Sequence, residues 1–402
     1  MKNGWPTKAL AKVCQIKPPK SEARDKLAES DLVSFLPMED MGIDQMFVRP
    51  SQAKPLREVA GSYTYFAEDD VLLAKITPCF ENGKLGIAEG LTNGIGFGSS
   101  EYVVFRPDET LSKEWLYYFL SREAFRVEGA ERMSGAVGHK RVSKEFIESY
   151  PIPVPPLPEQ QRIVGILDEA FEGIATAKTN SEKNLQNARA LFASHLQSVF
   201  ANQHSAGWKQ KTLEEIATTF GRGKSKHRPR NAPHLYGGKY PFVQTGDIRN
   251  ADHIITEYSQ TYSEAGLAQS KLWPKGTICI TIAANIAETG ILGFDACFPD
   301  SVIGLVANPK EADVGFIEYL LQSFKARLQS MGKGSAQANI NMGTFENERF
   351  PFPSVTEQRQ IVAKLDGLRE ETERLATVYE HKIAALEELK KSLLNRAFTG
   401  KL

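Results

Sequence analysis

The sequence predicts a mixed α+β fold, in which two α/β globular domains are joined by two long antiparallel coiled-coil helices with an internal pseudo-twofold repeat. Three observations predict it: a helix opening that occurs twice, short apolar β-branched runs in front of each opening, and coiled-coil spacing behind it. A chain of 402 residues is also long for a single hydrophobic core, so two or more domains are expected.

The helical segments show the duplication most clearly. An offset of 198 residues (159 to 357) takes Glu159, Gln160, Ile163, Val164, Leu167, Asp168, Leu191, Ser194, Leu196 and Phe200 to Glu357, Gln358, Ile361, Val362, Leu365, Asp366, Leu389, Ser392, Leu394 and Phe398. Outside the helices, Gly4-Trp5 matches Gly207-Trp208, and "EWLYYFL" (114–120) matches "GFIEYLL" (315–321). We interpret the chain as a tandem duplication of one unit, a globular region followed by a long helix.

Each globular region has the pattern of a mixed α/β domain. Apolar runs bounded by Gly, Pro, Asn and Asp predict strands within 31–38, 70–76 and 101–107 of the first copy, and within 240–248, 276–284 and 301–309 of the second. One amphipathic helix is expected in each copy, at 115–126 and 316–331.

Proline-rich stretches mark the junctions between the globular regions and the helices. "YPIPVPPLPEQ" (150–160) and "FPFPSVTEQ" (350–358) should end any strand or helix and set an extended lead-in. We therefore predict four segments: a first globular domain at 1–155, a first helical region at 156–202, a second globular domain at 203–353 and a second helical region at 354–402.

Both helical regions carry a coiled-coil seam, with residues spaced alternately by four and three. The predicted seam of the first helix is Ile163, Leu167, Ala170, Ile174, Ala177, Ser181, Asn184, Ala188, Leu191 and His195. That of the second is Ile361, Leu365, Leu368, Thr372, Leu375, Tyr379, Lys382, Leu386, Leu389 and Leu393. Small residues in the first seam would let the bulkier second helix approach, so we expect the two helices to pair with each other. Two surface helices of one compact core are the alternative.

Topology predicts the direction of the helices. The first must lead from the first globular region to the second, and in an equivalent repeat the second must lead back, so the two run antiparallel. Two segments of duplex DNA would need such a spacer, because groove-reading elements must be held a set number of helical turns apart.

Composition indicates a globular protein, with 41% hydrophobic and 24% charged residues and a net charge of zero. The sequence shows neither a secretory signal nor an apolar run long enough to span a bilayer, so we expect a cytoplasmic protein without a membrane partner. Cys14, Cys79, Cys279 and Cys297 lack CxxC spacing, so we expect plain thiols and no metal site.

Basic and amide residues in the expected loops are the candidates for contact with DNA. In the second copy, a Gly- and Pro-broken stretch carries Arg222, Lys224, Lys226, Arg228 and Arg230, which suits phosphate contact, with a solvated charged loop as the alternative. The remaining candidates are Lys75, Thr77, Asn82, Lys84, His139, Lys140 and Arg141 in the first copy and Lys239, Thr245, Lys333, Gln337, Asn339 and Asn341 in the second. Such side chains suit base edges and phosphates, and the neighbouring glycines allow close backbone approach.

Several stretches together resemble the specificity subunits of type I restriction-modification systems (the HsdS family). They are "VSFLPMEDM" (33–41), "KITPCFENGK" (75–84), "SSEYVVFRP" (99–107), "PIPVPPLPEQQRIV" (151–164), "PFVQTGDI" (241–248) and "LLNRAFTGKL" (393–402). The resemblance covers the whole chain and implies two target recognition domains, each reading one half of a split, asymmetric site in double-stranded DNA.

The resemblance also implies partners and cofactors. Two methyltransferase subunits would dock on the helices and restriction subunits would join the larger complex. The residues expected to serve helix pairing or docking are Ile163, Leu167, Ile174, Leu191, Ile361, Leu365, Leu368, Leu375, Leu386, Leu389 and Leu393. No cofactor is expected on this chain itself. S-adenosylmethionine would be held by the methyltransferase subunits, and ATP and Mg by the restriction subunits.

The motifs do not support an enzyme. The chain has no Asn/Asp-Pro-Pro-Tyr/Phe motif of an adenine methyltransferase, no G-x-G-x-x-G cofactor loop and no Walker motif, so we expect no catalytic residues. Two alternatives stay open: a coiled-coil scaffold that binds proteins without reading DNA, and the specificity part of a combined restriction and modification enzyme.

Overall fold

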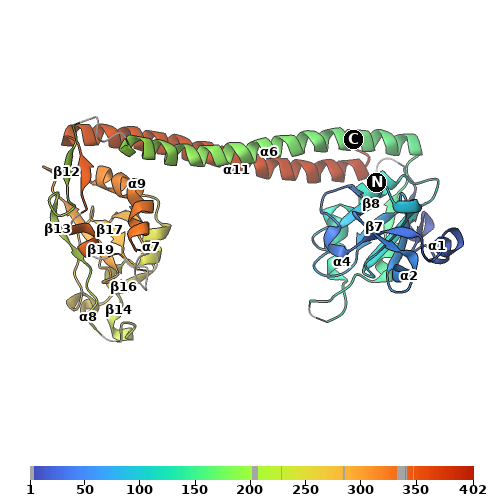
Figure 1. Ribbon diagram of the computed structural model, residues 1–402, viewed down its shortest axis with the longest axis horizontal. Helices are drawn as coiled ribbons and strands as arrows, with labels where there is room; N and C mark the ends of the chain where they lie inside the picture. Colours follow the sequence, from blue (N-terminus) through green and yellow to red (C-terminus); the bar gives the residue numbers. More distant parts are fainter. Residues whose placement is uncertain are drawn as a thin grey trace. The chain divides into compact units, whose positions relative to one another are not determined.

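The computed structural model describes residues 4–136, 138–201, 207–227, 229–283, 286–332, 340, 342–346 and 348–402 (Figure 1). The chain divides into two compact units, and each contains one globular domain with parts of both long helices. Unit 1 is Met1–Ser181 with His381–Leu402, and unit 2 is Glu182–Glu380.

A five-stranded sheet forms the centre of the globular domain of unit 1. Its order is β2-β10-β7-β8-β4, and neighbours are antiparallel except for β8 and β4, which are parallel. The strands are β2 (Cys14–Ile16), β10 (Tyr102–Pro107), β7 (Val71–Ala74), β8 (Leu85–Ala88) and β4 (Phe47–Val48). Every residue of β7 and β8 is buried, which agrees with their continuous apolar sequences, VLLA and LGIA.

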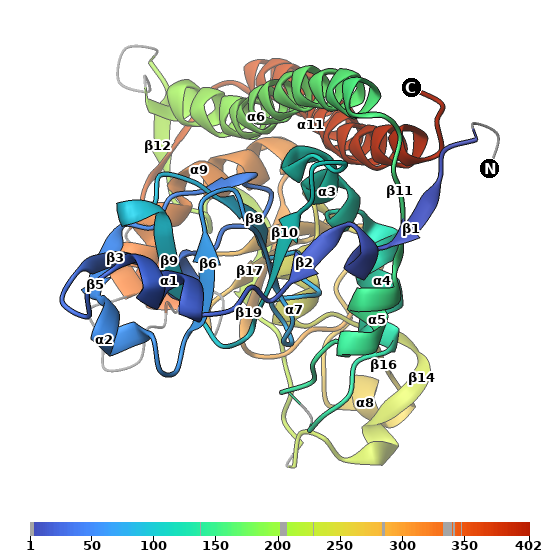
Figure 2. The same cartoon turned by 90° about the vertical axis from the view of Figure 1, so that its right-hand side faces the viewer.

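A second sheet, with four strands, lies beside the short helices of unit 1 (Figure 2). Its order is β5 (Gln52–Pro55), β3 (Leu32–Leu36), β9 (Ile95–Gly98) and β6 (Thr64–Ala67). Side chains of β3 and β9 share a buried cluster with α1 (Ser21–Lys26) and α2 (Leu56–Val59). Three short 3-10 helices complete this part of unit 1: η1 (Leu10–Lys12) precedes β2, η2 (Met38–Asp40) follows β3, and η3 (Thr92–Gly94) precedes β9.

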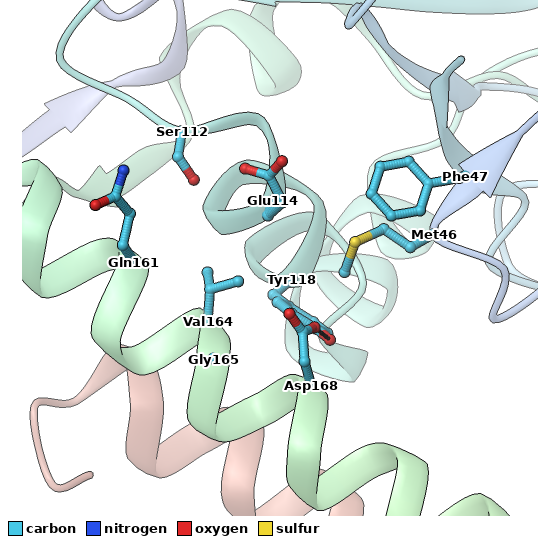
Figure 3. Close-up of a pocket in the computed structure, with 9 residues that line it drawn as sticks. All are labelled: Met46, Phe47, Ser112, Glu114, Tyr118, Gln161, Val164, Gly165 and Asp168. Carbon is cyan, nitrogen blue, oxygen red and sulfur yellow. Dashed lines mark hydrogen bonds between the residues drawn. The ribbon is translucent and has the colours of Figure 1, made fainter. Parts of the chain in front are cut away.

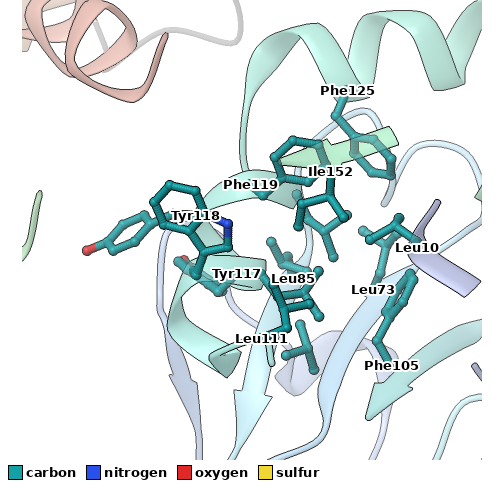
Figure 4. Packing of buried hydrophobic residues seen from close by; sticks show 14 of the residues in the cluster. Leu10, Leu73, Leu85, Phe105, Leu111, Tyr117, Tyr118, Phe119, Phe125 and Ile152 are labelled. Carbon is teal, nitrogen blue, oxygen red and sulfur yellow. The ribbon is translucent and has the colours of Figure 1, made fainter. Parts of the chain in front are cut away.

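Helix α3 (Lys113–Leu120) supplies much of the core of unit 1. It begins at Ser112, whose hydroxyl accepts a hydrogen bond from the Trp115 amide, and it buries six consecutive residues from Trp115 onward. Figure 4 shows Tyr117 and Phe119 of this helix among Leu73, Leu85 and other core side chains. The other elements of the domain are α4 (Glu123–Glu131), α5 (Lys144–Ser149) and an antiparallel pair of short strands, β1 (Thr7–Ala9) with β11 (Pro151–Pro153).

Unit 2 contains a five-stranded sheet with the equivalent order, β13-β19-β17-β18-β15, again with a parallel pair at one edge. The strands are β13 (Ala217–Arg222), β19 (Val302–Ala307), β17 (Ile278–Thr281), β18 (Thr289–Leu292) and β15 (Ile254–Ile255). Its other elements are β12 (Lys209–Lys211) paired with β20 (Phe350–Phe352), β14 (Tyr236–Phe242) paired with β16 (Gln260–Tyr262), η4 (Pro233–Leu235), α7 (Thr245–Asn250), α8 (Glu264–Ala268), α9 (Val314–Gly332) and α10 (Met342–Glu346). Among the described residues, unit 2 has no counterpart of the four-stranded sheet.

Matching contacts confirm the internal repeat. In unit 1, Trp115 contacts Trp5 and Phe398, and in unit 2 the equivalent Phe316 contacts Trp208 and Phe200. All of these rings lie where a globular domain meets a long helix. The duplicated Trp and Phe positions of the sequence therefore hold each domain to the helices.

The two long helices are continuous and antiparallel within each unit. Helix α6 (Leu157–Ala201) and helix α11 (Val355–Phe398) have 45 and 44 residues. In unit 1 the first turns of α6 share a core with Leu394, Ala397 and Phe398 at the end of α11, and in unit 2 the end of α6 shares a core with Leu365 near the start of α11. Lys178 pairs with Glu387 in unit 1 and Arg189 with Glu380 in unit 2. These contacts confirm the predicted pairing and its direction.

The predicted seam is followed up to Ser181 in α6 and up to the repeat-equivalent Tyr379 in α11, and then changes register. After Ser181 the packed positions include Leu185, Ala188, Phe192 and Leu196, while the predicted Asn184, Leu191 and His195 are exposed. After Tyr379, Ile383 and Lys390 replace the predicted Lys382 and Leu389, which are exposed. A straight α-helix turns every 3.6 residues, so a strict 3.5-residue pattern drifts off its packed face. Leu191 and Leu389 are 50% and 47% exposed and do not belong to the buried seam.

Three local predictions were wrong. The single helix expected at 115–126 is two helices, because Arg122 adopts an extended backbone and starts α4. The strand expected at 240–248 ends at Phe242, and α7 follows because Gln244 and Asp247 form a reciprocal capping box. The proline-rich lead-ins are extended as expected but contain the short paired strands β11 and β20.

No helix in the described part of the chain is both long and apolar enough to cross a bilayer. Cys14, Cys279 and Cys297 are buried thiols and Cys79 is partly buried, as predicted. Burial raises the pKa of Cys14 to about 12.

Candidate nucleic-acid interface

Two candidate loops of unit 1 that lie far apart in the sequence are brought together. The amide of Thr77 donates to the Lys140 carbonyl at 2.9 Å, and the amide of Val142 donates to the Lys75 carbonyl at 3.0 Å. Isolated bridges also pair Arg141 with Ile76 and with Ser134. The described residues of the segments 75–84 and 134–142 therefore form one joint surface, which we call the first-domain loop pair.

Arg141 is the most firmly held cation of the first-domain loop pair. Its Nε and Nη2 donate to the two carboxylate oxygens of Glu101 at 2.9 and 2.8 Å, and its Nη1 donates to the His139 carbonyl at 3.1 Å. The pKa of the Glu101 carboxyl lies below its ordinary value, chiefly because Arg141 donates hydrogen bonds to it. A bidentate pair of this kind fixes the plane of the guanidinium as well as its position.

The other candidates of the first-domain loop pair differ in accessibility. Lys75 is half-buried and its Nζ donates to the Ser100 carbonyl at 3.0 Å, and burial lowers its pKa. Lys84 donates to the Met38 carbonyl at 2.7 Å and the Thr77 hydroxyl donates to Glu81 at 2.7 Å, so both are engaged within the domain. The candidates that are exposed at the surface are Asn82, His139 and Lys140, together with Arg141.

The basic loop of unit 2, of which residues 222–227, 229 and 230 are described, is anchored at both ends to Asp300. Arg222 Nε donates to the Asp300 carbonyl and Arg230 Nη2 to its carboxylate, both at 2.7 Å. Gly223 is needed at the start of the loop, because a Cβ there would lie 2.3 Å from the Phe298 carbonyl oxygen. Lys224 and Lys226, between these anchors, are exposed. Two of the predicted cations thus hold the loop and two face solvent.

The remaining candidates of unit 2 are separate from this loop in the sequence. Lys239 forms an ion pair with Glu264 at 3.1 Å, and Thr245 is half-buried in the first turn of α7. Arg228, Lys333, Gln337, Asn339 and Asn341 lie outside the described residues.

Residues that the sequence did not single out as contacts hold the helices to the domains. The Gln160 side chain, fully buried, accepts from the Ser112 amide and donates to the carbonyls of Thr110 and Pro155, each at 2.8 Å. Gln358 repeats the arrangement in unit 2 with the Asp313 amide and the carbonyls of Glu311 and Pro353. The only signal in the sequence was the recurrence of this glutamine at both helix openings.

A cleft of about 620 Å³ lies in unit 1 beside the first turns of α6 (Figure 3). It is lined by Met46, Phe47, Ser112, Glu114, Tyr118, Gln161, Val164, Gly165 and Asp168. Burial raises the pKa of Tyr118, and its hydroxyl donates to Asp168, with Tyr319 and Asp366 repeating this bond in unit 2 at 2.6 Å. Tyr118 and Asp168 in the cleft are therefore used in a hydrogen bond that joins α3 to α6. Phe47, at the edge of the cleft, is half-exposed.

In the part of the chain that the structure describes, no three His, Cys, Asp or Glu side chains are grouped so as to hold a metal ion.

Comparison with known proteins identifies similar sequences. The family described as "Type I restriction modification DNA specificity domain" matches the chain twice, at residues 2–186 and 205–381. The specificity subunit of the type I restriction enzyme EcoAI of Escherichia coli is 38% identical over 163 residues, which are 40% of this chain and 27% of that protein. The putative type I restriction enzyme MjaX specificity subunit of Methanocaldococcus jannaschii is 22% identical over 349 residues, 83% of this chain and 78% of that protein.

Coverage differs among these relatives. The match spans only about a quarter of the length of EcoAI and of the similar EcoEI specificity subunit, 27% of each. The match to the MjaX subunit, by contrast, extends over most of both chains.

Two solved structures share the fold. One comes from a study of complex assembly and conformational transition of the type I restriction-modification system, with a TM-score of 0.79 and 20% identity over 100% of this chain and 99% of that one. The other is the HsdS subunit from Thermoanaerobacter tengcongensis, with a TM-score of 0.72 and 19% identity over 100% of this chain and 98% of that one.

Proposed function

The chain belongs to the family of type I restriction-modification DNA specificity domains, and from this premise we propose that it supplies sequence specificity to a type I restriction-modification complex. Each globular domain binds one half of a two-part, asymmetric site in double-stranded DNA. The observation that supports this most directly is a sheet of the same order used twice with different loops. A shared frame with unlike loops suits two half-sites of unlike sequence.

Loop chemistry supports DNA as the ligand. The first-domain loop pair contains the exposed Lys140 and the half-exposed Arg141. The basic loop of unit 2 contains the exposed Lys224 and Lys226. Lysines suit phosphates and arginine suits base edges as well, so each domain has groups for backbone contact, and the first also has an oriented guanidinium.

The chain itself is a non-catalytic subunit in this proposal. Partner methyltransferase subunits, two because the helix-domain junction occurs twice, would hold S-adenosylmethionine and methylate adenine. Restriction subunits would bind ATP and Mg. Exposed apolar side chains on the long helices, Ile166, Leu191, Val378 and Leu389, support docking there, because they are not packed within the chain. The complex would act on DNA in the cytoplasm.

Methylome sequencing tests this proposal. A host carrying the chain with its neighbouring methyltransferase gene is compared with the same host lacking the chain. Methyladenine in a two-part motif only when the chain is present is the expected result, and it would reveal both half-sites. No difference between the hosts, with the methyltransferase active in both, would contradict the proposal and favour a scaffold.

A further inference from the structure

The bidentate pair of Arg141 and Glu101 joins two separate parts of unit 1. Glu101 immediately precedes β10 of the central sheet, and Arg141 lies in the first-domain loop pair. The side chain of Glu101 is 21% exposed and that of Arg141 is 46% exposed. The carboxylate is thus set into the domain surface while much of the guanidinium remains accessible.

The guanidinium has donors left for a ligand. It carries five N–H groups, and three of them are used: two by the carboxylate of Glu101 and one by the His139 carbonyl. Among the described residues, no acceptor is bonded to the other two. An arginine held in this way keeps a donor pair in a fixed orientation, so little side-chain entropy is lost when it binds.

The backbone beneath Arg141 is also fixed. Two hydrogen bonds, from Thr77 to Lys140 and from Val142 to Lys75, hold its loop against the end of β7. Lys75 and Arg141 both act electrostatically on Glu101, so two cations face one carboxylate. The surplus positive charge favours a nearby phosphate, while the oriented fork of Arg141 matches the O6 and N7 acceptors of guanine.

We propose that Arg141 reads a guanine in the half-site bound by the first domain and that Glu101 is the positioning residue that orients it. The proposal rests on the proposed function, because it requires the chain to bind DNA. It adds a specificity-determining pair, one member of which carries a charge that repels DNA.

The sign of the Glu101 effect separates this role from a purely structural one. If Glu101 were only a neighbouring charge, its neutralisation would tighten binding to every sequence, since a carboxylate repels phosphates. If Glu101 orients Arg141, its neutralisation reduces the preference for the correct base, whatever happens to overall affinity. Discrimination between sequences is therefore the quantity to measure.

The experiment uses the full chain assembled with its methyltransferase subunits and duplexes based on the site found by methylome sequencing. Each base pair of both half-sites is changed singly, and dissociation constants are measured for the wild type, Glu101→Gln, Arg141→Lys and the double variant. Glu89→Gln is the matched control, because Glu89 pairs with the exposed Arg49 in the same domain.

We expect Arg141→Lys and Glu101→Gln each to reduce discrimination at one G·C pair of one half-site by about tenfold. The double variant should discriminate no worse than Arg141→Lys, because both changes remove the same oriented fork. The other half-site and the Glu89→Gln control should keep full discrimination.

The possible failures are distinguishable. A wild-type complex without any sequence preference would refute the proposed function. The wild type could discriminate between sequences while Glu101→Gln keeps full discrimination, or while Glu101→Gln only binds every duplex more tightly. Either result would overturn the role of Glu101 but not the proposed function. Should Glu101→Gln lower the melting temperature by more than a few degrees, Glu101→Asp keeps the charge and shortens the reach, and full discrimination in that variant would likewise overturn the proposal.

Discussion

At the scale of single residues, two buried side-chain amides join the long helices to the globular domains. Gln160 and Gln358 each satisfy one backbone N–H and two carbonyls at the junction between domain and helix. The sequence shows that this glutamine recurs, but its partners precede it by as many as 50 residues. Its role could not be predicted, because it depends on a contact that only the folded domain creates.

Replacing Gln160 should therefore destabilise the chain. In Gln160→Ala, buried backbone groups lose their partners, and we expect the free energy of unfolding to fall by roughly 3 kcal/mol. Gln161→Ala is the control, because Gln161 is exposed on the next position of α6, and it should change the free energy of unfolding by less than about 0.5 kcal/mol. Denaturant unfolding followed by circular dichroism measures both, and equal stability of the two variants would refute the role.

The cations of the basic loop in unit 2 should divide into two classes. Replacing Lys224 and Lys226 by Ala removes exposed charges, so we expect weaker binding to all DNA sequences. The slope of log affinity against log salt concentration should become less steep by about 0.9 for each phosphate that is no longer neutralised. Binding titrations at several salt concentrations measure the slope. Lys209→Ala is the control, because Lys209 is exposed on β12, which pairs with the strand before α11. An unchanged slope in the double variant would contradict phosphate contact.

At the scale of elements, the apolar pattern of the sequence predicted several strands and one helix, but it missed features that depend on local capping and on helix packing. The strands β3, β7 and β10 lie within the predicted apolar runs, and α9 covers the whole of the helix predicted at 316–331, because buried elements need such sequences. Helix α7 was missed, because its capping box lies inside an apolar run that suggested a strand. The register change after Ser181 and Tyr379 was also missed, because sequence alone does not distinguish a 3.5-residue from a 3.6-residue repeat over a few turns.

The register change makes a testable distinction between neighbouring leucines. Leu196 is 5% exposed in the core of unit 2, so Leu196→Ala should lower the free energy of unfolding by about 2–5 kcal/mol. Leu191→Ala should change it by less than about 0.5 kcal/mol, because Leu191 is half-exposed, and should instead weaken association with the methyltransferase subunit. Thermal unfolding and co-purification measure the two effects. A loss of stability in Leu191→Ala as large as that in Leu196→Ala would contradict the register change after Ser181.

At the scale of the whole molecule, the sequence predicted the duplication, and the family match at residues 2–186 and 205–381 agrees with it. The residues of the two candidate surfaces were less predictable. Arg141 and Lys140 could be named from the sequence, but Glu101 could not, because the pairing of a strand end with a loop 40 residues away depends on the tertiary fold. The cations of the candidate site could thus be named from the sequence, whereas the carboxylate that pairs with Arg141 could not.

The continuity of both helices leads to the last prediction, on the spacing between half-sites. We expect the pair α6 and α11 to set this spacing, so both must be lengthened together. Seven residues inserted after Ser181 and seven after Tyr379, at repeat-equivalent positions, add two turns and about 10 Å to each helix while nearly preserving its packed face. With DNA rising 3.4 Å per base pair, the preferred gap should grow by about three base pairs and both half-sites should stay the same.

Methylome sequencing of cells carrying the doubly lengthened chain measures the gap directly. Insertion in α11 alone is the control, because it places the remaining turns out of register with α6 and should abolish specific methylation rather than lengthen the gap. A doubly lengthened chain that methylates the original site with its original gap would show that something other than the helix pair sets the spacing.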